Sequence, residues 1–200
     1  MIGLGPLCES ELAPAILLLA RAFRDNPLNC AVIRSRRPER RQRVNAHGLR
    51  ALLPVAQKRG RVLAARADSD VVGALISIPP FAYPLPPPSA VPRLRCLAGQ
   101  GLRVSIRWAQ AFHALDEAHP LEPHWYLSTL GVDPCRQGQG FGSALLRAWL
   151  RDVDLESEPA YLETDREENM AFYVREGFEP IGELSVLGTR VWSLWRTARP

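Results

Sequence analysis

Hydrophobic positions recur along this chain with two periods, one typical of helices and one typical of strands. Apolar residues three and four positions apart predict helices over residues 10–23 and 39–58. Apolar or alternating runs predict strands over residues 2–7, 61–67, 71–78, 124–132 and 159–164, with a closing hairpin over 178–187 and 189–195. Further helices are predicted over residues 93–119, 139–152 and 166–176. Because strands and helices are interleaved without a linker, we expect one α/β domain over residues 1–200.

A proline-rich segment interrupts this pattern after the third strand. Residues 79–92 contain seven prolines, which fix the backbone and supply no N–H donors to a sheet. We therefore expect a stiff, extended loop or lid in place of a strand. Phe81 and Tyr83 within it are candidate walls of a substrate pocket, and anchoring of the loop to the core is the alternative interpretation.

Composition and charge narrow the class of protein. The 200 residues are 46% hydrophobic and 23% charged, which is typical of a globular domain. The net charge of +4 suggests nucleic acid, but the arginine cluster at residues 34–43 has no aromatic residue for base stacking. Neither a signal peptide nor a membrane span is indicated, so we expect a cytoplasmic monomer or homodimer that binds neither nucleic acid nor membrane. The four cysteines lack metal-binding spacing, so no metal is expected.

A glycine-rich segment follows the strand at 124–132 and opens the helix at 139–152. Gly138, Gly140 and Gly142 stand at alternate positions, where glycine permits backbone conformations and close approaches that other residues do not. Free N–H groups at a helix start bind phosphate, so this segment is a candidate phosphate or pyrophosphate site. It lacks the lysine of a P-loop, and its spacing differs from the Gly-x-Gly-x-x-Gly of dinucleotide-binding folds.

Further strings accompany this segment. The pattern Gln137-x-x-Gly140-x-Gly142 is followed by Leu162-Glu163-Thr164, Asn169, Phe172-Tyr173 and Gly177-Phe178. Thr164 and Glu167 have the spacing of a capping box, which predicts the start of the helix at 166–176. In type and order these residues resemble the GNAT family of N-acetyltransferases, most closely the branch around puromycin N-acetyltransferase. The resemblance covers the chain from His124 onward, and more loosely residues 22–27.

The resemblance implies a GNAT fold, a mixed and mostly antiparallel twisted sheet of about seven strands flanked by four to five helices. It also implies a splayed strand pair that holds acetyl-CoA as cosubstrate, and a bulge in the preceding strand that we place at Gly131. The cofactor arm is then expected along Leu130, Gly131 and Val132. The other expected cofactor-binding residues are Gln137, Gly138, Gln139, Gly140, Phe141, Gly142, Ser143, Asn169 and Phe172.

The resemblance further implies candidates for the proton transfers. Tyr173 is the expected general acid, because a phenol is protonated at neutral pH and suits a thiolate leaving group, with core packing as the alternative. Glu163 is the candidate base, with a strand-end ion pair as the alternative. His124 and Tyr126 share one strand face and are candidate substrate contacts, His124 also as a base, with a structural role of His124 at the strand start as the alternative. An acyl-enzyme on Cys135 has no histidine near it in sequence to support it.

We therefore expect an acyltransferase that moves an acetyl group from CoA to the primary amine of a small molecule by direct attack. The alternative, from a different class, is a GNAT-fold protein that binds acyl-CoA without catalysis, as a sensor or interaction module. Tyr173 together with Asn169 favours the enzyme, because a sensor needs no acid beside the thioester.

Overall fold

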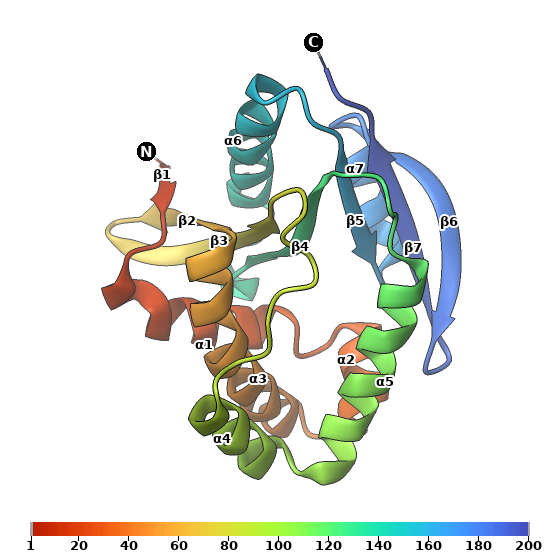
Figure 1. Cartoon of the computed structure of the whole chain (residues 1–200). Helices are drawn as coiled ribbons and strands as arrows, with labels where there is room; N and C mark the ends of the chain where they lie inside the picture. Colours follow the sequence, from red (N-terminus) through yellow and green to blue (C-terminus); the bar gives the residue numbers. More distant parts are fainter. Residues whose placement is uncertain (1, 200) are drawn as a thin grey trace.

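A twisted seven-stranded sheet forms the centre of the molecule, with helices on both of its faces (Figure 1). The computed structural model describes residues 2–199, so the two end residues of the expected 1–200 domain lie outside it. The strand order is β1-β2-β3-β4-β5-β7-β6. The strands are β1 (Gly3–Pro6), β2 (Arg61–Ala67), β3 (Asp70–Ile78), β4 (Trp125–Val132), β5 (Ala160–Thr164), β6 (Glu179–Val186) and β7 (Thr189–Arg196). Only the central β4–β5 pair is parallel among them, which confirms the mixed, mostly antiparallel sheet.

Seven α-helices surround the sheet within residues 2–199, more than the four to five expected. They are α1 (Leu12–Ala22), α2 (Pro27–Ile33), α3 (Pro38–Arg59), α4 (Ala90–Gln100), α5 (Leu102–Ala118), α6 (Phe141–Leu155) and α7 (Met170–Val174). The excess has two causes. The short α2, which starts at a proline, carries too few residues to show a helical period. The single helix expected over 93–119 is instead two, because Gly101 adopts a positive φ of 82° between α4 and α5.

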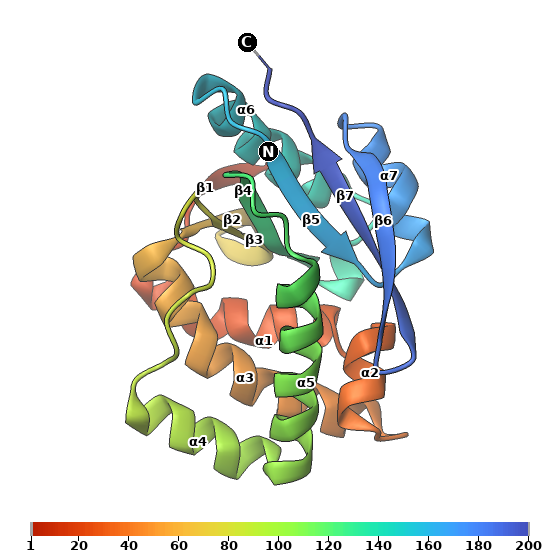
Figure 2. The ribbon, with the colours of Figure 1, turned by 45° about the vertical axis from the view of Figure 1, so that its right-hand side comes forward.

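Alternate residues of the strands supply two separate cores. Leu75 of β3 and Leu162 of β5 pack with Trp149 of α6 on one face of the sheet. Ala74 and Ile76 of β3 point the other way and pack with α1 and α3. Figure 2 shows α1 and α3 together beneath the sheet, with α5 and α2 continuing this layer toward β6 and β7. The period-2 pattern of the strands therefore fixes which helices cover which face.

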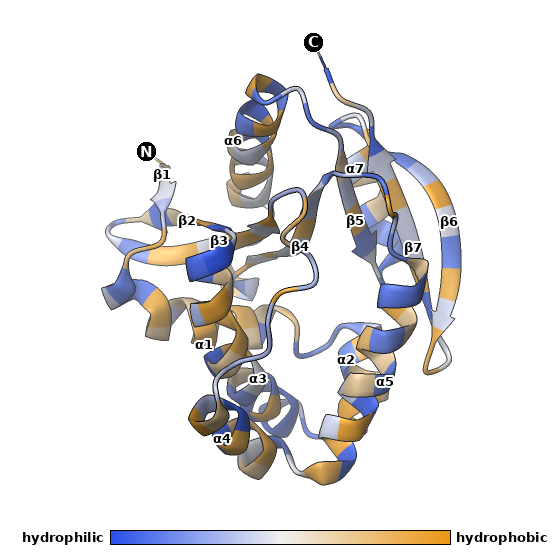
Figure 3. Cartoon of the chain, viewed as in Figure 1, coloured by the Kyte–Doolittle hydropathy of each residue, from blue (hydrophilic) through white to orange (hydrophobic). Residues whose placement is uncertain are grey.

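Hydrophobic and hydrophilic residues also alternate along the edge strand β6 and the helix α5. In Figure 3, β6 carries alternating hydrophobic and hydrophilic bands, and α5 presents both kinds of residue along its length.

The segment from residue 79 to 89 contains neither helix nor strand, which confirms the expected loop. It begins with a turn in which the Ala82 N–H donates to the Pro79 carbonyl at 3.1 Å, and its last proline, Pro92, lies in the first turn of α4.

The parallel pair β4–β5 separates soon after it forms. Its register comprises Trp125–Ala160, Tyr126–Tyr161 and Leu127–Leu162, and no pairing follows although β4 continues to Val132. On the other edge of β4, residues as far as Val132 pair with β3. The splayed strand pair expected from the resemblance is therefore present, and the backbone of residues 128–132 is unpaired on its β5 side.

The bulge of β4 lies at Ser128, so its expected position at Gly131 is wrong. Ile76 pairs with Thr129 and Ser77 with Leu127, which leaves Ser128 without a partner on β3. Gly131 serves a different purpose. A Cβ at that position would lie 2.7 Å from Leu19 and 2.9 Å from Phe23 of the α1 region, closer than atoms can pack. The missing side chain lets α1 lie directly against β4.

We predict that Gly131→Val destabilises the protein by about 1–3 kcal/mol, because the added side chain overpacks the α1–β4 contact. Urea denaturation measures the change. Gly182→Val is the matched control, since Gly182 also lies in a strand but an added Cβ there meets nothing within 4 Å. Equal losses in the two variants would show that α1 does not depend on the bare backbone of Gly131.

Candidate active site

The glycine segment forms an open turn that leads directly into α6. Gly138 and Gly140 adopt positive φ of 75° and 84°, and Gly140 is the residue that caps α6. An added Cβ at either glycine meets no other atom within 4 Å, so the space over the turn is open. The Gln137 side-chain amide donates to the Val132 carbonyl at 3.2 Å and holds the turn against the end of β4.

This turn presents a set of unused N–H donors. The Ala144 N–H is the first of α6 to find a helical acceptor, the Gly140 carbonyl at 2.9 Å, so the three N–H groups before it are free. The N–H groups of residues 138–140 also have no acceptor among residues 2–199. Because they gather at the positive end of the 15-residue α6, the turn favours a phosphate or pyrophosphate group.

The expected cofactor residues come from three elements that meet at this turn. A Cβ on Gly142 would lie 3.6 Å from Val132 at the end of β4 and 4.0 Å from Phe172 of α7. Leu130, Val132 and Phe172 pack together against the core that α6 covers. The unpaired backbone of β4, the start of α6 and the side chain of Phe172 therefore border one region, as the sequence predicted.

Tyr173 lies in the short α7 and is buried among aromatic rings. Its ring lies 5.0 Å from Phe172 and 6.0 Å from Phe178. Burial, together with the Asp165 carboxylate, raises the pKa of the Tyr173 hydroxyl, which keeps it protonated at neutral pH. Within residues 2–199 the hydroxyl makes no hydrogen bond, so its proton is free for a ligand. Asn169 immediately precedes α7, is half-buried and makes no capping bond.

The capping box expected at Thr164 and Glu167 is absent. The Thr164 hydroxyl instead accepts the Arg166 N–H at 3.4 Å and closes a local turn. The helix then begins as a 3-10 turn at Glu167, so its N-cap is Arg166 and not Thr164. Thr164 is held in β5 by its pairing with Trp192, which is why it does not serve as the cap.

Glu163 lies on the opposite face of β5 from Leu162, beneath a cluster of aromatic side chains. Its carboxylate, together with burial as the larger cause, raises the pKa of the hydroxyls of Tyr126 and Tyr161. His124 joins the same cluster, with its ring 5.3 Å from Tyr161. Burial is also the main cause that lowers the pKa of His124. The sequence-predicted residues Glu163, His124 and Tyr126 are therefore brought together.

The two aromatic residues of the proline-rich loop have separate environments. The Tyr83 ring lies 5.1 Å from Tyr126, and its hydroxyl donates to Asp116. Burial, aided by this hydrogen bond, raises the pKa of the Tyr83 hydroxyl. Phe81 is 88% exposed and belongs to no aromatic contact among residues 2–199. Tyr83 therefore lies beside the cluster that contains Tyr126, whereas Phe81 points to solvent, so the two rings do not line one pocket together.

His119 is a member of the cluster that sequence reasoning missed. It follows the last turn of α5, its ring stacks on Tyr83 at 3.8 Å, and its Nδ1 lies 3.8 Å from the Glu163 carboxylate. It stands far from Glu163 in sequence and in no motif. The one available signal was its residue type at the end of a helix that leads into the strand of His124.

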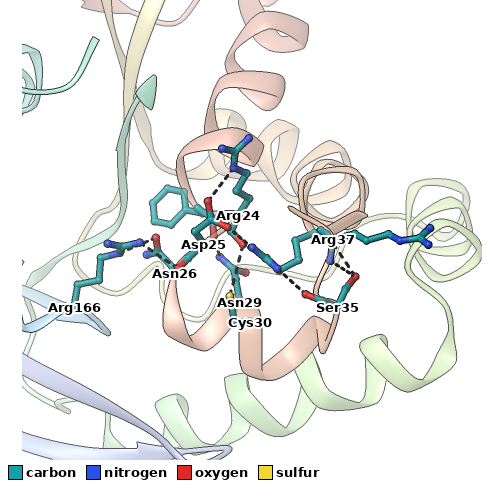
Figure 4. A network of polar contacts seen from close by, with 10 residues as sticks. Arg24, Asp25, Asn26, Asn29, Cys30, Ser35, Arg37 and Arg166 are labelled. Atoms are coloured by element: carbon teal, nitrogen blue, oxygen red, sulfur yellow. Dashed lines mark hydrogen bonds and ion pairs between the residues drawn. The ribbon is translucent and has the colours of Figure 1, made fainter. Parts of the chain in front are cut away.

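A polar network ties the turn between α1 and α2 to the end of β5 (Figure 4). The Asp165 carboxylate accepts the Leu28 N–H at 2.8 Å and the Asn26 side-chain amide at 3.1 Å. The Arg166 guanidinium donates through Nε to Oδ1 of the Asn26 side chain at 3.1 Å. Asp25 in the same turn pairs with Arg41 of α3. The loop after β5, which positions Tyr173, is therefore held from the opposite face of the sheet.

The chain was compared with known families and solved structures. Residues 103–180 match the family model of the acetyltransferase (GNAT) domain. The structure is similar to that of an acetyltransferase from Corynebacterium glutamicum named as "histone acetyltransferase HPA2 and related acetyltransferase", with a TM-score of 0.77, 23% identity, and coverage of 100% of this chain and 97% of that one. It is also similar to PaiA N-acetyltransferase from Thermoplasma acidophilum in complex with coenzyme A, with a TM-score of 0.61, 15% identity, and coverage of 98% and 99%.

A third similar structure is the ribosomal-protein-S18-alanine N-acetyltransferase from Escherichia coli, with a TM-score of 0.59, 14% identity, and coverage of 100% and 96%. At these identities the likenesses show the fold, and the expected GNAT fold is confirmed. Across residues 2–199, no helix has the length and apolar character to cross a membrane. The same residues contain no group of three or more side chains placed to hold a metal ion.

We predict that Asp165→Ala destabilises the protein by about 1–3 kcal/mol, because two donors of the α1–α2 turn lose their acceptor. Urea denaturation again measures the change. Glu168→Ala is the control, because the Glu168 side chain is 67% exposed and contacts only Arg166 through an ion pair. The network is unimportant for stability if the two variants unfold at the same urea concentration.

Proposed function

We propose that this protein is an acetyl-CoA-dependent N-acetyltransferase acting on the primary amine of a small molecule, because residues 103–180 match the family model of the GNAT acetyltransferase domain. We place it in the branch around puromycin N-acetyltransferase on the resemblance of residues 124–127 and of the glycine segment. The acceptor is proposed only as a class, because a fold does not determine its substrate.

The observation that carries this proposal is the open turn before α6. Its free N–H groups, at the positive end of a long helix, suit the pyrophosphate of coenzyme A. The bare backbone of Gly138 and Gly140 leaves room for a ligand to approach these donors. The residues present therefore fit the cosubstrate that the family uses.

The separated strands supply the second part of the binding site. Beyond Leu127, β4 has unpaired N–H and C=O groups on its β5 side, and a buried unpaired backbone group needs a partner. An extended pantetheine arm with its amides can pair with residues 130–132 as an added strand does. The arm then runs from the turn before α6 toward the end of β5, where Glu163 and Tyr173 lie.

The two proton-transfer groups lie on opposite faces of the sheet. Glu163 faces the aromatic cluster, whereas Tyr173 belongs to the core beneath α6 and α7. Acetyl-CoA supplies the activated acetyl thioester. Glu163 accepts the proton of the attacking amine, and Tyr173 gives its hydroxyl proton to the departing thiolate. A base and an acid on either side of the reacting carbon suit direct attack without an acyl-enzyme.

A steady-state assay for released CoA thiol against a panel of small amines tests the proposal. Amine-dependent release of thiol is expected from the full chain. Tight CoA binding without thiol release on any amine would favour the alternative, an acyl-CoA-binding sensor or interaction module.

Gly140→Val should remove measurable CoA binding, because the side chain fills the space proposed for the pyrophosphate. Isothermal titration calorimetry measures the affinity. Valine is strained at the positive φ of Gly140, so Gly188→Val is the matched control, with a φ of 79° in the β6–β7 turn and open space around it. The control should bind CoA like the wild type, and unchanged affinity in Gly140→Val would contradict the assigned site.

Tyr173→Phe removes one proton donor and little volume, so folding and CoA affinity should survive. We expect kcat to fall by roughly 10- to 1,000-fold, within the range for a lost general acid. The comparison is made at saturating acetyl-CoA, with thermal unfolding measured beside it. A wild-type kcat would show that water or another group protonates the thiolate.

A further inference from the structure

Two buried polar atoms face each other near the end of β5 without a hydrogen bond. They are Nδ1 of His119 and one carboxylate oxygen of Glu163, 3.8 Å apart. The two side chains are only 8% and 7% exposed. Neither atom has a hydrogen-bond partner among the described residues, whereas buried polar atoms of native structures usually have one.

Aromatic rings fix the orientation of the His119 imidazole. Tyr83 stacks on it at 3.8 Å with 15° between the planes. Tyr126 and Tyr161 meet it edge-on at 4.9 and 5.1 Å. The imidazole therefore cannot turn to find another acceptor, and its Nδ1 stays directed at Glu163.

The hydrogen bonds of His124 assign the protons of both imidazoles. Nδ1 of His124 lies 2.6 Å from the Glu122 carbonyl, which only accepts, so this nitrogen carries a hydrogen. Burial lowers the pKa of His124, so its ring is neutral and its Nε2 is an acceptor. Nε2 of His119 lies 3.1 Å away and must donate to it. Nε2 of His119 is thus committed to His124, and Nδ1 is the His119 nitrogen that faces the Glu163 carboxylate.

We propose that His119 is a positioning residue that takes over the proton that Glu163 removes from the acceptor amine. This inference rests on the proposed function. The amine nitrogen forms the new bond to the acyl carbon as the bond from that carbon to the CoA sulfur breaks, and the departing thiolate takes the hydroxyl proton of Tyr173. The proton of the amine moves to the Glu163 carboxylate and from there to Nδ1 of His119. Glu163 is thereby returned to its anionic form, and the proton is held as an imidazolium until product release exposes the pair to water.

The other titratable groups around the pair do not compete for this proton. Tyr83, Tyr126 and Tyr161 keep their hydroxyl protons at neutral pH, since burial raises the pKa of each. Asp116 of α5 already accepts the hydroxyl of Tyr83. His124 is committed to the Glu122 carbonyl through Nδ1.

The pH dependence of kcat in His119→Asn tests the proposal. We expect kcat at neutral pH to fall about 100-fold and the acidic limb of its profile to move by about one pH unit. The Michaelis constants for acetyl-CoA and amine should change less than about threefold, because His119 contacts neither. His113→Asn is the matched control, since His113 also lies on α5 but its side chain is 75% exposed. It should keep the wild-type profile.

Glu163→Gln, measured in parallel, distinguishes a failure of this inference from a failure of the proposed N-acetyltransferase function. If Glu163→Gln is inactive and His119→Asn keeps the wild-type pH profile, the role proposed for His119 is overturned, whereas Glu163 remains the proposed base. Wild-type turnover in Glu163→Gln would contradict both the assignment of Glu163 as the base and the role proposed for His119.

Nitrogen-15 NMR of the wild-type protein adds a readout that needs no variant. A proton on Nε2 of neutral His119 and on Nδ1 of His124 supports the relay, and a proton on Nδ1 of neutral His119 overturns it.

Discussion

Backbone N–H and C=O groups inside a sheet must be paired, and between β4 and β5 that pairing ends after three residue pairs. The two strands are parallel, so they are joined by a crossover through α6 and not by a tight turn. The crossover starts at the glycine turn, next to the unpaired stretch of β4. The open edge and the free N–H donors at the start of α6 are therefore consequences of one topological feature, the parallel β4–β5 pair in a sheet whose other described strand pairs are antiparallel.

The separation must be held open from outside, because two adjacent strand edges would otherwise pair. On the β4 side, Gly131 lets α1 lie directly against the strand. On the β5 side, Asp165 and Arg166 bind the α1–α2 turn through Asn26 and the Leu28 N–H. The same short segment, the end of α1 and the turn after it, thus contacts both strands. A stretch near the N-terminus therefore supports both sides of the separated strand pair.

The elements with a strong period could be predicted from the sequence, and so could the glycine turn. Strand positions, α3 and α6 follow from runs long enough to show a pattern, and the turn follows from three closely spaced glycines at the start of a predicted helix. The bulge at Ser128 could not be predicted, because it depends on how β3 and β4 align and not on a residue type. His119 could not be predicted either, since only the end of α5 in the folded chain brings it to Glu163.

Buried charges elsewhere in this chain show what complete pairing looks like. Arg196 is 2% exposed, and its two terminal nitrogens contact Asp154 at 2.6 and 2.9 Å while its Nε donates to the Glu176 carbonyl. Each of the three nitrogens of that guanidinium donates to an acceptor, as expected of a group that stabilises the fold. The side chains of His119 and Glu163 are also largely buried, at 8% and 7% exposed, but they stand 3.8 Å apart with both facing atoms unsatisfied. Other buried atoms without a partner among the described residues lie on Asn45, Arg107 and Trp149, and the pair beside Glu163 is distinguished by two titratable groups that face each other near the end of β5.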